Sequence, residues 1–142
     1  MSKRKVLFLC TGNSCRSQLA EAIVNAQPEL GRQAFSAGTK PAGYIHPMAL
    51  RALDEIGIQH RGRSKSVDEL RDTAFDLVVI VCDSAAEECP LWLGRGKRVH
   101  LGFPDPAKAT GSEDEVMAVF REVRDDIARK IPDSMASTTL AK

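Results

Sequence analysis

The 142-residue chain lacks any apolar run near the roughly 20 residues that a membrane-spanning helix needs. It also lacks an excess of charge of either sign, because 20 lysines and arginines balance 19 aspartates and glutamates, for a formal net charge of +1. Such a balance argues against a protein held to nucleic acid or to an acidic membrane by bulk electrostatics. We therefore expect neither nucleic acid nor a membrane as a partner.

The apolar stretch at residues 6–9 is too short for the apolar region of a secretion signal, so we expect none. We expect a cytoplasmic protein whose four cysteines are reduced at rest and available for chemistry. With 43% hydrophobic and 27% charged residues, the composition is typical of a globular domain. We place one domain at residues 1–132, expect residues 133–142 to fray because they show no periodicity, and expect a monomer.

Short apolar runs alternate with helical patterns along the chain. Buried strands are predicted at residues 6–9, 34–37, 77–81 and 98–101, and helices at 17–24, 47–56 and 112–131, with a helical turn at 67–70. Ser112 is expected to cap the last helix and Pro132 to end it. This alternation predicts an α/β fold, a single-domain three-layer structure with a four-stranded parallel sheet flanked by helices.

The strongest functional signal lies between the first strand and the first helix. Cys10 and Arg16 are separated by five residues, among them Gly12. In such a loop, successive backbone N–H groups turn inward beside the positive end of a helix dipole and form a cradle for a tetrahedral oxyanion. Arg16 can hold the anion with two donors, and the same field stabilises the nucleophilic thiolate of Cys10. The predicted oxyanion-binding residues are Thr11, Gly12, Asn13, Ser14, Cys15, Arg16 and Ser17.

This loop resembles that of the low-molecular-weight protein tyrosine phosphatases and of the thioredoxin-coupled arsenate reductases that share their fold. The resemblance covers residues 5–131 and includes Asp105, in the Phe-Pro-Asp-Pro stretch at 103–106, where the family carries its general acid. An aspartate on a proline-stiffened loop is suited to protonate an oxygen that leaves the bound anion. The resemblance therefore implies a low-molecular-weight-phosphatase-like fold in which Cys10, Arg16 and Asp105 are catalytic.

Two further cysteines, Cys82 and Cys89, bear on the choice between the two activities. A phosphatase needs one catalytic sulfur and water, whereas reduction of arsenate needs two electrons, for which thiols are the available source. Cys82 and Cys89 match the redox pair of the reductases, so the resemblance implies that both are catalytic. The implied reaction is reduction of arsenate to arsenite through a Cys10–Cys82 and then a Cys82–Cys89 disulfide. Thioredoxin is the implied electron donor, and glutaredoxin with glutathione is the alternative.

Two alternative functions stay open. One is a low-molecular-weight protein tyrosine phosphatase acting through a Cys10 phosphoenzyme. Gln18 and Ala107 disfavour it, because those phosphatases usually carry proline and an aromatic residue at these places, but residual phosphatase activity is compatible with a reductase. The other is a redox sensor without turnover, which would need neither Asp105 nor Arg16.

Many reductases of this kind bind potassium near the loop, through groups that correspond to Asn13, Glu21, Ser36 and an aspartate near position 65. This chain has a lysine at position 65. We therefore predict that the Lys65 ammonium takes the place of the potassium ion, and we expect no tightly bound cofactor.

The remaining cysteines and histidines are expected to be structural. The cysteine spacings do not match zinc motifs, so no metal site is predicted. Cys15 is expected to be a buried loop residue, and His46, His60 and His100 to lie at the surface or in structural hydrogen bonds.

If residues 83–89 are helical at rest, the Cα atoms of the Cys82–Cys89 pair lie roughly 10 Å apart, whereas a disulfide tolerates at most about 7 Å. We therefore predict that this segment unwinds on oxidation.

Overall fold

The computed structural model describes residues 4–82 and 96–140, and of residues 134–140 the backbone alone. Within these residues, one parallel sheet has the strand order β2-β1-β3-β4. The strands are β1 (Arg4–Cys10), β2 (Arg32–Gly38), β3 (Leu77–Ile80) and β4 (Lys97–His100). The predicted α/β fold with a four-stranded parallel sheet is confirmed, and β1, which ends at Cys10, lies inside the sheet.

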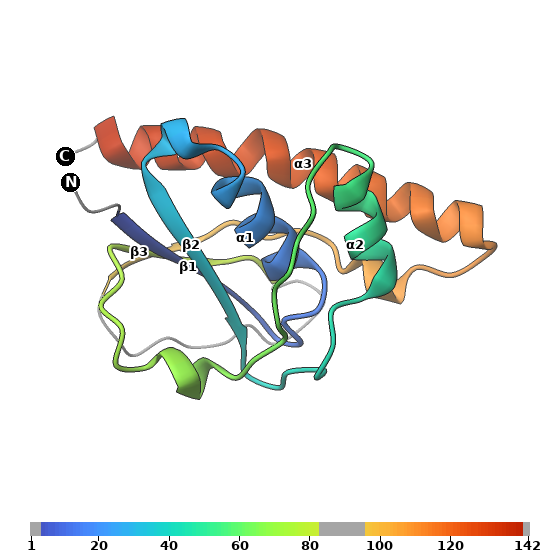
Figure 1. Ribbon diagram of the computed structural model, residues 1–142, viewed down its shortest axis with the longest axis horizontal. Coiled ribbons are helices and arrows are strands. Elements are labelled where there is room, and N and C mark those ends of the chain that lie inside the picture. The colour runs from blue at the N-terminus through green and yellow to red at the C-terminus, as the bar shows by residue number, and fades with distance from the viewer. Residues whose placement is uncertain (1–3, 83–95, 141–142) are drawn as a thin grey trace.

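Helices connect the strands and cover the sheet. They are α1 (Arg16–Asn25), α2 (Pro47–Asp54) and α3 (Glu113–Leu140), with the short 3-10 helices η1 (Pro28–Leu30), η2 (Val67–Leu70) and η3 (Pro106–Lys108). Figure 1 shows the three α-helices gathered on one side of the sheet and η2 on the other. No helix among the described residues is long and apolar enough to cross a membrane.

The two faces of β1 pack against different layers. Val6 and Phe8 are fully buried in the cluster that includes the apolar residues of the three α-helices. Leu7 and Leu9 are buried in a second cluster that includes Val67 of η2. Side chains alternate between the faces of a strand, so an unbroken apolar run serves both layers of the core.

The last helix begins where its capping residue predicts. The Ser112 hydroxyl accepts a hydrogen bond from the Glu115 N–H at 3.1 Å, and the Glu115 carboxylate accepts one from the Ser112 N–H at 3.2 Å. This reciprocal pair is a capping box, which satisfies donors that a helix start leaves without partners. The apolar stripe of α3 is buried in the core at Met117, Phe120, Val123, Ile127 and Ile131.

The predicted end of this helix is wrong, because α3 continues through Pro132 to Leu140. A proline inside a helix removes one backbone hydrogen bond and crowds the preceding turn, which disfavours the helix without forbidding it. Here the preceding turn is anchored by Ile127 and Ile131, both buried in the core. The domain boundary at residue 132 and the fraying of residues 133–142 stay predictions.

A charged cluster ties the end of α2 to α3. The Glu55 carboxylate accepts hydrogen bonds from Arg121 at 2.8 Å and from Arg124 at 2.9 Å. Arg124 also donates to the carbonyl of Ala52 at 2.9 Å, one of the groups that a helix end leaves without a partner. The Arg121 hydrogen bonds are the main cause that lowers the pKa of Glu55 from 4.5 to about 2.

This shift predicts a loss of stability in acid. A carboxyl group whose pKa is lower in the folded state stabilises the fold above its unfolded pKa and loses that contribution as it becomes protonated. We expect the free energy of unfolding to fall as the pH drops from 4.5 toward about 2, and to fall less in Glu55→Gln. Urea unfolding of both proteins at pH 7 and pH 3 measures the difference. Equal losses in the two proteins would contradict the assignment.

Candidate active site

Residues 11–15 join the end of β1 to the start of α1 in a tight loop. Asn13 adopts a left-handed backbone conformation with φ of 49°, which asparagine tolerates better than most residues. Its N–H donates to the Cys10 sulfur at 3.2 Å. Gly38 of β2 lies so close behind the loop that a side chain there would collide with the Thr11 carbonyl. The loop therefore wraps around the sulfur, as the sequence predicts.

A second donor reaches the Cys10 sulfur from α1. Ser17 Oγ lies 2.9 Å from Cys10 Sγ and accepts a hydrogen bond from Asn13 Nδ2 at 2.8 Å. When Cys10 is a thiolate it has no proton to donate, so the Ser17 hydroxyl supplies the hydrogen of this contact. Cys10 itself is buried. Two hydrogen-bond donors directed at one buried sulfur stabilise negative charge on it.

Arg16 and Asp105 meet beside the loop. The Arg16 guanidinium is buried, donates to the Phe103 carbonyl at 3.2 Å and lies 3.7 Å from Asp105 Oδ2. The other carboxylate oxygen of Asp105 accepts the Ala107 N–H at 3.0 Å, at the start of η3. The Phe103 N–H donates to the Val81 carbonyl just beyond β3, which fixes the loop against the sheet.

A cavity of about 190 Å³ opens where these elements meet. Among the predicted site residues, it is lined by Cys10, Gly12, Asn13, Ser14, Cys15, Arg16 and Asp105. Ser17 contacts Cys10 from behind, and Thr11 braces the loop, since its carbonyl accepts the Lys40 N–H at 2.9 Å. The sequence did not identify Ala42, Tyr44 and His46 as lining residues, because only the folded loop after β2 brings them to the rim.

Cys15 is buried, as predicted. Burial is the largest cause that raises the pKa of its thiol to about 12, and the charges of Asp105 and Cys10 raise it further. A thiol with this pKa stays protonated at neutral pH and is a poor nucleophile. Cys15 is therefore poorly suited to be the nucleophile, although it lines the same cavity as Cys10.

Cys82 is fully buried just beyond β3. Leu9 pairs with Ile80 in the parallel register, so Cys10, the last residue of β1, and Cys82, just beyond β3, lie at the same end of neighbouring strands. The Cys82 sulfur is in a disulfide, whereas Cys10 and Cys15 have free thiols, so the expectation that all four cysteines are reduced is wrong for Cys82. Cys89 and the predicted unwinding of residues 83–89 lie outside the described residues.

The predicted histidine roles agree with the structure. His46 accepts the Met48 N–H through Nδ1 at 3.1 Å and so caps α2. His100 Nε2 lies 2.8 Å from the Cys82 carbonyl, and His60 is hydrogen-bonded to Gln18. Each of the three therefore takes part in a hydrogen bond that holds the fold.

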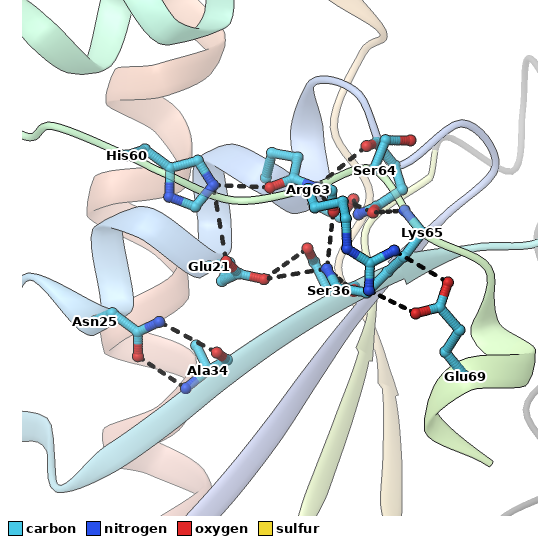
Figure 2. Close-up of polar contacts among 12 residues, drawn as sticks. Glu21, Asn25, Ala34, Ser36, His60, Arg63, Ser64, Lys65 and Glu69 are labelled. Carbon is cyan, nitrogen blue, oxygen red and sulfur yellow. Dashed lines mark hydrogen bonds and ion pairs between the residues drawn. The ribbon is translucent and has the colours of Figure 1, made fainter. Parts of the chain in front are cut away.

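Behind the loop, the ammonium group of Lys65 lies near Ser36 and Glu21, two of the residues named above for a cation site (Figure 2). Lys65 Nζ donates to the carbonyls of Ser36 and Arg63, both at 2.9 Å, and lies 3.9 Å from Glu21 Oε1. Burial lowers the pKa of Lys65, and the Glu21 carboxylate opposes that effect. These oxygens already surround an ammonium group. The residues present therefore leave no site that fits a potassium ion in addition.

Comparison with known proteins places this geometry in a family. Residues 5–142 match the family described as low molecular weight phosphotyrosine protein phosphatase. The chain belongs to this family. It is 45% identical over 134 residues to the arsenate reductase of Halalkalibacterium halodurans, an alignment that covers 92% of this chain and 94% of that protein.

Solved structures agree with this family assignment. The arsenate reductase of Archaeoglobus fulgidus superposes with a TM-score of 0.72 at 28% identity, over 92% of this chain and 98% of that one. The thioredoxin-dependent arsenate reductase of Corynebacterium glutamicum gives a TM-score of 0.64 at 26% identity, over 96% of this chain and 63% of that one. The protein is thus an enzyme of the low-molecular-weight phosphatase family with arsenate reductases among its relatives.

Proposed function

We propose that this family member is an arsenate reductase that uses a cysteine relay. The observation that carries the proposal is the position of Cys82, buried beyond the end of the strand next to the one that ends in Cys10. A phosphatase has no use for a second sulfur there, whereas a reductase needs one to supply electrons. The disulfide at Cys82 and the arsenate reductases among the relatives support this choice.

The first step joins the nucleophile to the oxyanion. Arsenate binds in the loop, with its oxygens facing the backbone N–H groups and the Arg16 guanidinium. The Cys10 thiolate attacks arsenic, a sulfur–arsenic bond forms, and one oxygen leaves as water after Asp105 donates a proton. Asp105 lines the same cavity and its carboxylate is oriented by Arg16 and by the Ala107 N–H.

The next steps transfer two electrons. In the reduced enzyme, the Cys82 thiolate attacks the Cys10 sulfur, so that a disulfide forms and the sulfur–arsenic bond breaks. The electron pair of that bond stays on arsenic, which leaves as arsenite. Cys89 then attacks Cys82, Cys10 is released as a thiolate, and the disulfide moves to the Cys82–Cys89 pair. A thioredoxin dithiol reduces this disulfide and is itself oxidised, a donor supported by the Corynebacterium relative.

A monomeric state and a location in the cytoplasm stay predictions.

A matched pair of assays separates the reductase from the phosphatase. The reduced enzyme is mixed with a small excess of arsenate or with an aryl phosphate, and arsenite and free phosphate are measured. We expect one arsenite per enzyme in the absence of a reductant, and hydrolysis of the aryl phosphate that is at most slow. Rapid aryl phosphate hydrolysis without arsenite would show that the protein is a phosphatase.

We also propose that Lys65 acts as a built-in cation for the site. Its ammonium neutralises Glu21 and holds the Ser36 and Arg63 carbonyls, so a diffusible ion has no role there. We expect equal turnover in potassium and sodium chloride at matched ionic strength. In Lys65→Asp we expect turnover to fall in sodium and to recover at least partly in potassium, because the carboxylate recreates an oxygen-lined site. Strong potassium activation of the wild-type enzyme would contradict the proposal.

A further inference from the structure

Gln18 is fully buried behind the loop at residues 11–15, called the anion loop from here on. It has no role in the reaction described above. The two protons of its Nε2 group are shared among three acceptors, the Asn13 carbonyl at 3.2 Å, Asn13 Oδ1 at 3.0 Å and the Arg63 carbonyl at 3.0 Å. Its Oε1 atom lies 2.7 Å from His60 Nε2. Both ends of this buried amide are therefore engaged, as buried polar groups require.

The contact with His60 fixes which way the amide faces. An amide oxygen can only accept, so the proton of this hydrogen bond belongs to His60 Nε2. A flipped Gln18 amide would set its oxygen against two oxygens of Asn13 and its NH2 group against the His60 N–H. The same nitrogen of His60 also lies 3.7 Å from Oε2 of Glu21, a residue of α1 (Figure 2). A side chain at position 62 would collide with both His60 and Gln18, so the glycine at this position makes their contact possible.

Gln18 and the nucleophile share one intermediary, Asn13. The donors of Asn13 serve the nucleophile, since its N–H reaches Cys10 and its Nδ2 reaches Ser17. The acceptors of Asn13 are held by Gln18, with the Lys65 N–H adding a bond to Oδ1 at 2.9 Å. Asn13 adopts a left-handed backbone conformation that costs energy in most residues. The bonds from Gln18 help to hold it there.

We propose that Gln18 is a positioning residue for the Cys10 nucleophile, acting through Asn13, and that His60 fixes the orientation of the Gln18 amide for this task. The proposal rests on the proposed function in one respect, that Cys10 is the nucleophile. It does not depend on which oxyanion Cys10 attacks or on how the enzyme is later reduced.

The test measures the reactivity of Cys10 directly. The reduced protein is treated with iodoacetamide at pH 7, and mass spectrometry of peptides follows the label on Cys10 alone. Gln18→Met keeps the length of the side chain but removes its hydrogen bonds, so we expect alkylation of Cys10 to slow about tenfold, as the loss of one or two buried hydrogen bonds implies. Gln27→Met makes the same change beyond the end of α1, away from the anion loop, and should leave the rate within twofold.

The role of His60 is tested by a double-mutant cycle. We expect His60→Ala to slow alkylation about threefold in the wild-type background and to add nothing in the Gln18→Met background, because its effect passes through Gln18. If Gln18→Met does not fold, Gln18→Glu takes its place, since its carboxylate accepts from His60 but donates nothing to Asn13. Its expected slowing is at least as large.

Two results would overturn the proposal: alkylation of the Gln18 variants within twofold of wild type, or a His60→Ala effect that persists unchanged in the Gln18 variant. Urea unfolding midpoints of all variants show whether a slower rate merely reflects partial unfolding. Arsenate is absent from these reactions. A failure of arsenate reduction would therefore leave the alkylation pattern in place and would count against the proposed function alone.

Discussion

Replacing Cys10 by serine lowers arsenate turnover by about 10⁴-fold or more, the largest loss that we expect from any single substitution. A serine hydroxyl is mostly protonated at neutral pH and is a weaker nucleophile than a thiolate. Serine also cannot form the disulfide that releases arsenite. The measurement is arsenite formation at saturating arsenate with a thiol reductant.

The Cys10→Ser variant should still bind the anion. The loop N–H groups and the Arg16 guanidinium remain, so the affinity for phosphate, measured by calorimetry, should change by less than about tenfold. Phosphate binding without turnover would place the defect in chemistry rather than folding. Turnover above about one hundredth of wild type would show that another sulfur carries out the attack.

Arg16→Lys lowers kcat/KM for arsenate by about 10²- to 10³-fold, the loss typical of removing one donor from a preorganised oxyanion site. A lysine keeps the charge but not the planar fork that binds two oxygens at once. It also removes the buried guanidinium from the Phe103 carbonyl and the Asp105 carboxylate, so the segment that carries the general acid loses two contacts.

The matched control for this substitution is Arg129→Lys, on the exposed side of α3 and ion-paired with Asp126. Its kcat/KM should stay within twofold of wild type. A loss below tenfold in Arg16→Lys, with unfolding midpoints unchanged, would mean that the guanidinium does not hold the anion.

Local rules predicted the parts of the molecule that local chemistry controls. The apolar run that becomes β1, the capping serine at 112 and the loop from Cys10 to Arg16 depend on residues that are neighbours in the chain. Pro132 does not end the helix as predicted, because helix propensity is a local quantity, whereas the turn before Pro132 is anchored by buried Ile127 and Ile131.

The contacts behind the loop could not be read from the sequence. Gln18 and His60 are 42 residues apart, and glutamine and histidine are common in many environments. The segment at residues 60–65 meets α1 in the fold, where its end is fixed to the end of β2 by the hydrogen bond from the Gly38 N–H to the Lys65 carbonyl. Position 65 drew attention because the resemblance places an aspartate of a potassium site near it. Gln18 had no such signal beyond its contrast with the proline of related phosphatases.

We propose that electrons pass from an external dithiol through Cys89 and Cys82 to Cys10 and the bound arsenate. The most direct measurement follows NADPH oxidation with arsenate, thioredoxin and thioredoxin reductase, and compares wild type with Cys89→Ser. We expect arsenate-dependent NADPH oxidation in wild type and its collapse in the variant, which should still release one arsenite per enzyme. Sustained turnover in Cys89→Ser, or no arsenate-dependent oxidation in wild type alongside rapid hydrolysis of an aryl phosphate, would contradict it.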